Sequence, residues 1–265
     1  MDYVTGASGF LGSHLLQALE GREVTAIPHA KIKTIKLKPF DNFFFLSAYG
    51  NMYSHTDDKK IIQANVSDLI DIILQVDGRK FNSFVYMSTS SVKLQKQTMY
   101  SRTKKASEEI LLSFAEKYHK PICIIRPYSI YGPKEQHQHL IPTLIRSCFE
   151  GELVNLSPNP VHDYIFVEDV AAGILSLSKH HARGIFELGT GIKTSNQEVL
   201  ELIEKITGKK ANVNIVGQLR LYDNEDWVSS NFRARSYGWL PKVSLRQGLE
   251  EVVRDYKKNP KFYEK

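Results

Sequence analysis

The chain has 265 residues, 42% hydrophobic and 24% charged, so it can bury a sizeable core as one large domain or a domain with a small appended lobe. Its formal net charge is +6, but the lysines are spread along the chain and do not gather on one helix face between aromatic residues, which argues against nucleic-acid binding. No apolar run of about 18 residues predicts a membrane span.

The start of the chain and its cysteines bear on where the protein works. A predicted strand begins within two residues of Met1, which leaves no room for a signal peptide. The only two cysteines are Cys123 in a predicted buried strand and Cys148 on a predicted helix. We therefore expect reduced thiols and a cytoplasmic protein.

The first predicted elements are a strand, a glycine-rich turn and a helix. Residues 2–5 read as a short buried strand, and leucines recur at helical spacing after the turn. Gly6 permits a tight turn, Gly9 lets the backbone approach a pyrophosphate, and Gly12 lets the helix pack closely on the strand. The start of the helix then faces the phosphates. This context predicts a dinucleotide-binding loop.

The residues after the second predicted strand, 23–27, bear on the choice of cofactor. A dinucleotide-binding fold that prefers NAD places an acidic residue here for the adenosine ribose hydroxyls. The sequence instead has Pro28 and His29, followed by Lys31 and Lys33. No carboxylate is available to repel a 2′-phosphate, and basic groups are at hand to bind one. We expect NADP(H), with His29 and Lys31 among its contacts; NAD(H) beside a merely basic loop is the alternative.

The next strand follows unusually early. Residues 42–47 form a buried-strand pattern that begins only about a dozen residues after the second strand. A parallel crossover needs a dozen or more residues by itself, so a helix and a further parallel strand cannot both fit. The alternation from Ile32 to Leu37 favours a hairpin back along the second strand, or a loose loop. In both cases the sheet edge is shortened.

A helix is predicted over residues 57–76, a strand over residues 84–88 and a second helix over residues 99–119. At the start of the second helix, Tyr100 and Lys104 are spaced i and i+4 and project from one face. An ammonium beside a phenol stabilises the ionised phenol, which suits a tyrosine for acid or base catalysis near neutral pH. The pair alone also occurs on many solvated helix faces.

Several short motifs follow one another along nearly the whole chain. They are the turn at 5–12, Ser-Thr-Ser-Ser at 88–91, Tyr-Ser-Arg-Thr-Lys at 100–104, Arg-Pro-Tyr-Ser-Ile-Tyr-Gly-Pro at 126–133, the His-Asp-Tyr segment at 162–170, Glu-Leu-Gly-Thr-Gly at 187–191, and the closing segments at 238–241 and 245–249. Together they resemble the extended short-chain dehydrogenase/reductase family of NAD-dependent epimerases and dehydratases. Its known members mostly act on nucleotide sugars.

The resemblance implies an α/β fold: a Rossmann-like, doubly wound parallel sheet with a small C-terminal substrate lobe. Residues 1–133 and about 163–189 would form the dinucleotide-binding domain. About 134–162 and 190–265 would form the nucleotide-sugar lobe and the closing helices. The helices over 57–76 and 99–119 would pair across a homodimer.

The resemblance also implies roles for individual residues. Tyr100 would donate a proton, Thr89 would hold the carbonyl with a second hydroxyl, and Lys104 would bind the nicotinamide ribose and lower the pKa of the tyrosine. Beside the three glycines, His29 and Lys31, the implied cofactor contacts are Ser8, Phe10, Leu11, Leu46, Ser47, Ala48, Lys104 and Pro127.

The implied substrate contacts include departures from the family pattern. They are Tyr49, Asn65, Ser90, Ser91, Ser129, His139, His162 and Arg220. Ser129 replaces the usual asparagine, and His162 replaces the usual arginine. Arg220 and His162 are the candidates for binding the diphosphate, and Arg220 is the better one because a guanidinium matches phosphate oxygens. A surface role is the alternative for Arg220. His139 is either a hydrogen-bond donor to substrate or a loop residue. No metal site is expected.

The chain lacks residues on which some reactions of the family depend, and this limits the reactions to be expected. Family members that dehydrate sugars have an Asp-Glu pair where this chain has Ser90 and Ser91, so dehydration is disfavoured. Members that epimerise at C3 and C5 use a cysteine where this chain has Ser91. Reduction of a 4-keto group or epimerisation at C4 remains. The missing acidic residue after the second strand favours a reductase, which exchanges cofactor at each turnover and usually draws on NADPH.

The expected function is NADPH-dependent reduction of a nucleotide-linked 4-keto-6-deoxy or 3,6-dideoxy sugar in deoxyhexose or surface polysaccharide biosynthesis. Short matches at 47–50 and 223–225 are similar to synthases of CDP-3,6-dideoxyhexoses such as abequose or paratose. A nucleotide-sugar 4-epimerase with tightly bound NAD is the first alternative. A non-catalytic NAD(P)-binding regulator is the second.

Overall fold

The computed structural model describes residues 1–52, 54–217 and 227–264. The chain divides into two compact units. Unit 1 comprises Met1–Pro127, Ala171–Leu188 and Phe232–Leu240, and unit 2 comprises Tyr128–Val170, Gly189–Asn231 and Pro241–Lys265. The predicted functional division into a dinucleotide-binding domain and a substrate lobe stays a prediction.

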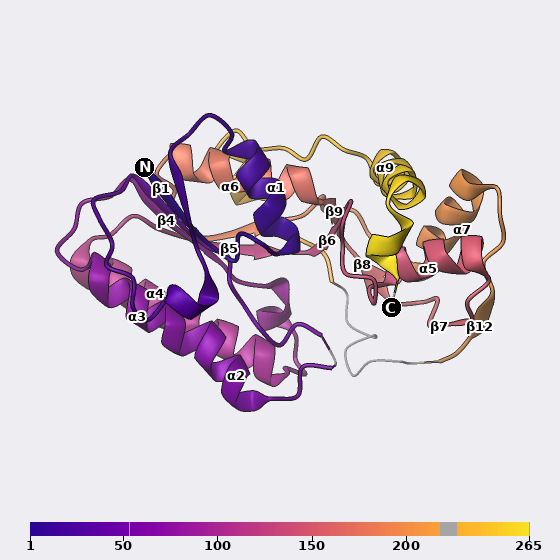
Figure 1. Ribbon diagram of the computed structural model, residues 1–265, viewed down its shortest axis with the longest axis horizontal. Coiled ribbons are helices and arrows are strands. Elements are labelled where there is room, and N and C mark those ends of the chain that lie inside the picture. Colours follow the sequence, from indigo (N-terminus) through magenta and orange to yellow (C-terminus); the bar gives the residue numbers. More distant parts are fainter. Residues whose placement is uncertain (53, 218–226, 265) are drawn as a thin grey trace. The chain divides into compact units, whose positions relative to one another are not determined.

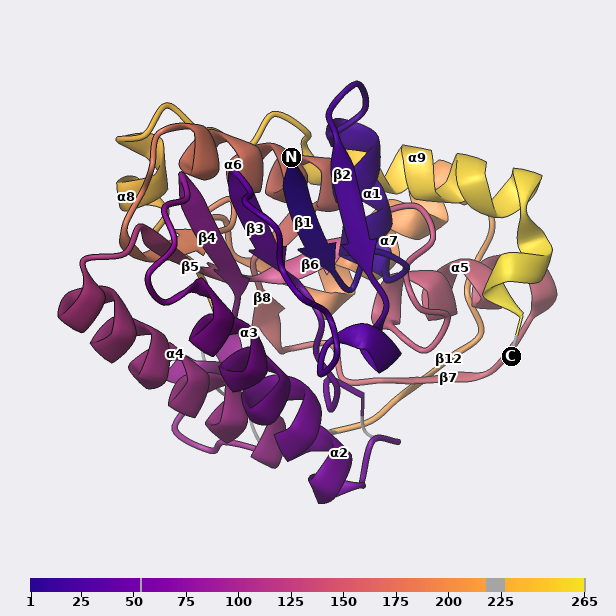
Figure 2. The same ribbon diagram turned by 60° about the vertical axis from the view of Figure 1, so that its left-hand side comes forward.

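Unit 1 is built on a six-stranded sheet in the order β10-β5-β4-β3-β1-β2, and all its neighbouring strands are parallel. Figure 2 shows β4, β3, β1 and β2 side by side. This sheet confirms the predicted Rossmann-like fold. The strands are β1 (Asp2–Thr5), β2 (Val24–Ile27), β3 (Asn42–Phe45), β4 (Ser83–Met87), β5 (Ile122–Pro127) and β10 (Gly184–Leu188).

Helices cover both faces of this sheet. α3 and α4 lie on one face, and α1 and α6 lie on the other (Figure 1). Among the described residues, no helix is long and apolar enough to cross a membrane. The helices are α1 (Phe10–Ala18), α2 (Asp58–Ile62), α3 (Asp68–Val76), α4 (Met99–Tyr118), α6 (Val167–Lys179) and α8 (Phe232–Arg235).

Aromatic side chains fill much of the core of unit 1. Phe43, Phe44 and Phe45 of β3 are all fully buried, as expected of a strand that is covered on both faces. The rings of Phe43 and Phe84 stack across β3 and β4 with centroids 5.0 Å apart. The continuous apolar run that predicted this strand therefore reflects its central place in the sheet.

The segment between β2 and β3 settles the two alternatives for the sheet edge. It contains one short 3-10 turn, His29–Lys31, and no strand, so the hairpin alternative is wrong and β2 is the edge. The loop is nevertheless packed, because Ile32 and Leu37 are buried and the Leu37 N–H donates to Gln75 Oε1 at 3.3 Å. The chain thus connects β2 to β3 by a loop that is bonded to α3, in place of a helix and a further parallel strand.

The predicted helix over residues 57–76 contains a π-helical turn. This turn, Gln63–Ser67, separates α2 from α3. A π turn adds a residue to the helical repeat and is frequent at functional sites. It carries Asn65, which is fully buried and bonds to two other segments of unit 1.

Unit 2 packs helices against small strand pairs. β6 (Ser129–Tyr131) pairs with β9 (Tyr164–Phe166), β7 (Val154–Leu156) with β12 (Val213–Ile215), and β8 (Val161–His162) with β11 (Thr194–Ser195). Its helices are α5 (Leu140–Glu150), α7 (Asn196–Thr207), α9 (Leu245–Lys258) and a 3-10 turn, Pro260–Tyr263. A second hydrophobic core, which includes Leu144, Ile203 and Val252, joins α5, α7 and α9.

Candidate functional site

The glycine turn after β1 has the geometry that the sequence predicts. Gly6 has a φ of +68°, which favours glycine. A Cβ at Gly6 would lie 2.8 Å from the backbone nitrogen of Ser47, and one at Gly12 would lie 2.0 Å from the carbonyl oxygen of Gly6. Both positions therefore require glycine, because a side chain would collide with backbone.

The turn presents the start of α1 to any anion bound there. Gly9 is the N-cap and supplies no side-chain hydrogen bond, so the side chains of the turn leave the first N–H groups of the helix uncapped. Such a terminus attracts phosphate oxygens. Of the predicted contacts around it, Ser8 is exposed, and Phe10 and Leu11 are half-buried.

The segment after β3 is locked to the end of β1 beside this turn. Thr5 Oγ1 accepts hydrogen bonds from the N–H groups of Leu46 and Ser47, at 3.1 and 3.2 Å. The hydroxyl of Ser47 bonds to the same oxygen at 3.0 Å. The structure thus brings the predicted cofactor residues Leu46 and Ser47 to the glycine turn, followed by exposed Ala48.

At the end of β2, the predicted basic residues have an acidic neighbour from another element. His29 Nε2 lies 2.9 Å from Asp68 Oδ2, and the Asp68 side chain is 2% exposed. Lys31 is exposed on the same turn as His29. Sequence reasoning found no carboxylate here because Asp68 lies on α3, far away in the chain.

The three predicted catalytic residues lie in unit 1 at the start of α4 and the end of β4. Thr98 caps α4 by accepting a hydrogen bond from the Ser101 N–H at 3.3 Å, which places Tyr100 in the first turn. The side chains of Thr89 and Tyr100 share a hydrogen bond. Thr89 Oγ1 also lies 3.0 Å from Ser91 Oγ. Three hydroxyls, of Thr89, Tyr100 and Ser91, are therefore gathered here.

The Tyr100 phenol keeps its proton at neutral pH. Burial raises its pKa to about 12, and the hydrogen bond with Thr89 opposes the rise. The expectation that Lys104 lowers this pKa is not met, because Lys104 is not among the groups that shift it. A protonated phenol is suited to donating a proton to a developing alkoxide.

Lys104 is fully buried. Its Nζ donates a hydrogen bond to the carbonyl oxygen of Met87 at 2.5 Å and lies 4.1 Å from the centroid of the Tyr86 ring. Burial lowers its pKa to about 7, against an opposing effect of Glu108. This amine therefore changes charge near neutral pH.

A buried ionic network lies one turn further along α4, and sequence reasoning missed it. Glu108 is fully buried and accepts hydrogen bonds from Arg126 Nε at 2.9 Å and from the Ser88 hydroxyl at 2.5 Å. Glu108 follows Lys104 at i+4, so the helical spacing was the available signal. The network ties α4 to the ends of β4 and β5.

Asn65 corrects one prediction of a substrate contact. Its side-chain amide is engaged inside unit 1: Oδ1 accepts from the Tyr49 N–H at 3.0 Å, and Nδ2 donates to the Tyr49 carbonyl and to Thr103 Oγ1. With no exposed surface, Asn65 fastens the loop after β3 to α4. Ser90 is also buried, whereas Tyr49 and Ser91 are half-buried.

The remaining predicted substrate residues belong to unit 2. Pro127, a predicted cofactor contact, is buried at the end of β5 in unit 1. Ser129 is on β6, His162 is a buried residue of β8, and His139 is the N-cap residue of α5. His139 Nδ1 lies 2.9 Å from Glu135 Oε1, a carboxylate neighbour that the sequence analysis overlooked. Arg220 and residues 223–225 lie outside the described residues.

Asp163, which the sequence analysis did not single out, is the main polar hub of unit 2. It is fully buried. Oδ1 accepts from the N–H and hydroxyl of Thr190, at 2.7 and 2.6 Å. Oδ2 accepts from the N–H of Gly191 and from the N–H and hydroxyl of Ser229, at 2.9, 3.1 and 2.5 Å. One carboxylate thus joins two segments far apart in the sequence.

We expect Asp163→Asn to lower the free energy of unfolding by about 3 kcal/mol, because the new amide group would face N–H and O–H donors and leave them unpaired. Urea unfolding would measure this change. The matched control is Glu168→Gln, which removes an exposed carboxylate and should change stability by less than about 0.5 kcal/mol. Equal unfolding midpoints for the two variants would contradict the role of Asp163.

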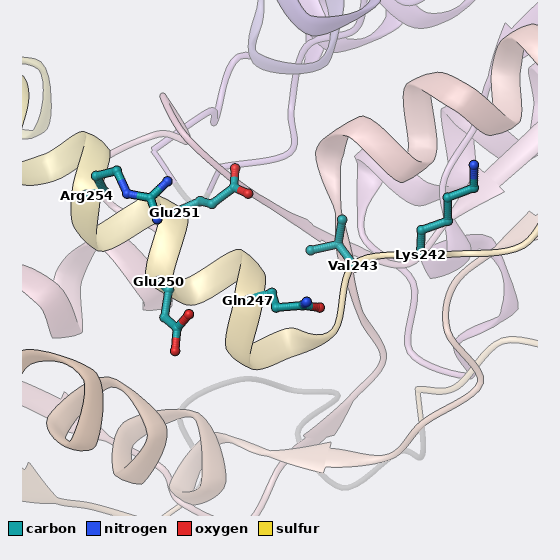
Figure 3. A pocket seen from close by; sticks show the side chains of 6 residues that line it. All are labelled: Lys242, Val243, Gln247, Glu250, Glu251 and Arg254. Carbon is teal, nitrogen blue, oxygen red and sulfur yellow. The ribbon is translucent and has the colours of Figure 1, made fainter.

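Unit 2 also has a surface depression of about 260 Å³ on α9, lined by Lys242, Val243, Gln247, Glu250, Glu251 and Arg254. Figure 3 shows four of these residues on the helix and two on the segment that leads into it. None of the predicted site residues lines the depression. Within the described part of the chain, no group of three or more His, Cys, Asp and Glu side chains could hold a metal ion.

The chain is similar to known proteins over most of its length. A model of the NAD dependent epimerase/dehydratase family matches residues 45–189, more than half of the chain. The low-salt glycan biosynthesis protein Agl12 of Haloferax volcanii is 25% identical over 74% of this chain and 65% of its own length. CDP-abequose synthase of Salmonella typhimurium is 24% identical over 95% of this chain and 96% of its own. The chain thus spans somewhat less than two thirds of the first relative and nearly all of the second.

The alignment with CDP-abequose synthase shows that this relative is longer than the chain. It runs over 302 positions, more than this chain of 265 residues contains, so the relative has stretches that the chain lacks. Among solved structures, MoeE5 in complex with UDP-glucose and NAD has the same fold, with a TM-score of 0.88, 23% identity and coverage of 98% of this chain and 99% of that one. Because the family match takes in the end of β3, Thr89 and the whole of α4, we conclude that the chain is an enzyme of the NAD dependent epimerase/dehydratase family.

Proposed function

We propose that the protein reduces the 4-keto group of a nucleotide-linked 4-keto-6-deoxy or 3,6-dideoxy sugar with NADPH. The observation that carries this proposal is the pairing of Thr89 with a Tyr100 phenol whose pKa is about 12. Two hydroxyls that share a hydrogen bond can both turn toward one carbonyl oxygen. One of them holds a proton that it can give up only to a strong base, such as an alkoxide.

The glycine turn fits a dinucleotide, because Gly6 and Gly12 leave no room for side chains and the side chains of the turn leave the start of α1 uncapped. Gly6, Gly9 and Gly12 would hold the pyrophosphate, Leu46 and Ser47 would line the same edge, and Lys104 would hold the nicotinamide ribose. When bound, the nicotinamide supplies hydride chemistry.

The residues of the chain then perform the proton chemistry. Thr89 donates a hydrogen bond to the carbonyl oxygen and polarises it, and Tyr100 gives its phenolic proton to that oxygen as negative charge develops. The hydroxyl of Ser91, 3.0 Å from Thr89 Oγ1, orients the threonine. Ser90 and Ser91 provide no carboxylate for removal of water, which argues against a dehydratase.

The relatives support a nucleotide-sugar substrate. CDP-abequose synthase matches this chain nearly end to end, the Haloferax volcanii relative is named for glycan biosynthesis, and the MoeE5 complex holds UDP-glucose. Similarity of this order leaves the base and the sugar open. We therefore assign the substrate as a nucleoside diphosphate sugar with a 4-keto group, from deoxyhexose or surface polysaccharide biosynthesis.

A 4-epimerase with tightly bound NAD is the second candidate. It is favoured by the NAD in the MoeE5 complex and by the epimerases that give the family its name. An epimerase removes hydride and returns it to the other face, so it retains its cofactor through the cycle. A reductase must release spent cofactor after each turnover.

Cofactor retention and cofactor consumption distinguish the two candidates. Freshly purified protein would be unfolded and any released nucleotide identified. The intact protein would then be mixed with NADPH and CDP- or dTDP-linked 4-keto-6-deoxyglucose, or CDP-linked 4-keto-3,6-dideoxyglucose. We expect no retained NAD, and NADPH oxidation in proportion to the sugar consumed. Retained NAD, together with epimerisation at C4 of a 4-hydroxy nucleotide sugar such as UDP-glucose without consumption of NADPH, would replace the reductase with the epimerase.

The assembly and location of the protein are also proposals. On family resemblance, residues 57–76 and 99–119 pair in a homodimer, and the protein is cytoplasmic. Light scattering tests the first point, because a mass near that of the 30.3 kDa chain would contradict the dimer.

A further inference from the structure

The contact between His29 and Asp68 lies at the end of the sheet where the adenosine half of a dinucleotide binds. β1 and β2 are parallel neighbours, and Thr5 is the register partner of Ile27. The chain therefore leaves β2 at the same edge at which it leaves β1 for the glycine turn. In this architecture, the residues just after the second strand face the adenosine ribose.

Asp68 is held from two sides. Gln63 Nε2 donates to Asp68 Oδ1 at 2.6 Å, and His29 Nε2 lies 2.9 Å from Asp68 Oδ2. Gln63 belongs to the π-helical turn, and Asp68 is the first residue of α3. The imidazole and the carboxylate thus come from elements about forty residues apart, and the loop after β2 is bonded to α3 through Leu37 and Gln75.

A carboxylate at this place has two possible consequences for cofactor choice. It could bind the ribose hydroxyls of NAD directly, or it could support His29 as a receptor for the 2′-phosphate of NADP. Burial decides between them. The Asp68 side chain is 2% exposed, with Oδ1 bonded to Gln63 and Oδ2 buried 2.9 Å from His29 Nε2, whereas the His29 side chain is 66% exposed. A bound cofactor would therefore contact the imidazole of His29 and not the carboxylate of Asp68.

We infer that Asp68 is a positioning residue that holds His29 as the receptor for the 2′-phosphate of NADP(H). The inference rests on the NADPH preference in the proposed function and deepens it. When a phosphate binds, both ring nitrogens donate, Nε2 to Asp68 and Nδ1 to the phosphate, so the ring binds as the cation. An orienting carboxylate behind a histidine fixes the plane of its ring and the direction of its outer N–H group.

Exposed Lys31 on the same turn adds positive charge without a fixed direction. His29 supplies the directed contact, because a buried partner restrains it. We therefore expect His29 and Asp68 to affect the preference for NADPH over NADH, whereas Lys31 attracts anions in general.

The test measures the dissociation constants of NADPH and NADH by fluorescence titration and follows their ratio. We expect His29→Gln and Asp68→Asn each to reduce the preference for NADPH over NADH by about tenfold, since a hydrogen bond to a charged group is lost or misdirected. NADH binding should stay within about twofold of the wild type. A purely structural role for Asp68 would weaken both cofactors alike.

Two further variants sharpen the result. His29→Arg combined with Asp68→Asn should keep the preference for NADPH, because a guanidinium binds phosphate without the carboxylate. The matched control is Lys80→Gln, which removes one exposed positive charge from the segment before β4, at the opposite end of the sheet, and should leave the ratio unchanged.

The outcomes separate this inference from the proposed function. Wild-type preference for NADPH with an unchanged ratio in His29→Gln and Asp68→Asn overturns the role of the pair alone. Wild-type preference for NADH overturns the inference and makes the proposed reductase an NADH enzyme. A ratio that falls in both variants supports the pair, even if no 4-keto sugar is reduced and the proposed reaction is rejected.

Discussion

Tyr100→Phe is expected to lower turnover by about 10³-fold, because it removes the phenolic proton that Tyr100 is proposed to transfer to the developing alkoxide. The dissociation constant of NADPH should change by less than about twofold, since the phenyl ring keeps the packing of the first turn of α4. Single-turnover kinetics with NADPH and a 4-keto nucleotide sugar would measure the first quantity, and fluorescence titration would measure the second.

The matched control is Tyr118→Phe, which removes a phenolic hydroxyl from the last turn of the same helix, where the side chain is 37% exposed. It should leave turnover unchanged. If Tyr100→Phe lost cofactor binding and turnover together, the tyrosine would be a structural residue of α4. If turnover survived in Tyr100→Phe, another group would donate the proton, and Thr89→Val would be the next variant to measure.

Local patterns predicted the parts of this molecule that depend on neighbouring residues in the chain. The glycine turn is one, because the φ of Gly6 and the close approach of Gly12 to Gly6 arise within seven residues. The buried run at β3 is another, since three consecutive phenylalanines fit only a strand covered on both faces. The missing strand followed from loop length alone.

Contacts between distant elements could not be predicted in the same way. Asp68 meets His29 because the loop after β2 packs on α3, and no periodic pattern in either segment reveals that packing. Asp163 bonds to Thr190 and Ser229 through turns without regular spacing. Asn65 matched a family position, but only its burial shows that it fastens a loop to α4 and does not face a substrate.

The spacing of Tyr100 and Lys104 was a partial signal. It correctly placed both side chains at the start of α4, but it could not specify what each contacts. Lys104 donates to Met87 and lies over the Tyr86 ring, and both partners belong to β4. Burial therefore lowers the pKa of the lysine to about 7, and the lysine does not lower the pKa of Tyr100.

Lys104→Met is accordingly expected to raise stability while lowering turnover. The unfolded chain keeps an ordinary lysine, with a pKa of 10.5, while the folded value is about 7. Between these values the unfolded state binds more protons, so wild-type stability rises with pH across this window. Below about pH 7 both states are protonated and the full cost of burying the ammonium applies. Methionine removes that cost, and we expect a gain of about 3 kcal/mol at pH 7, after loss of the bond to Met87.

Urea unfolding at pH 7 and at pH 9 would measure the gain, which should be smaller at the higher pH because the buried amine is then neutral in the wild type. The matched control is Lys105→Met, which changes the exposed neighbour and should alter stability by less than about 0.5 kcal/mol at either pH. Turnover of Lys104→Met should fall by about a hundredfold, because the group proposed to hold the ribose is gone. A variant that is less stable at both pH values would mean that the ammonium is satisfied in its buried position. A more stable but inactive variant would mean that the enzyme retains a buried charge for function at the expense of stability, as active sites commonly do.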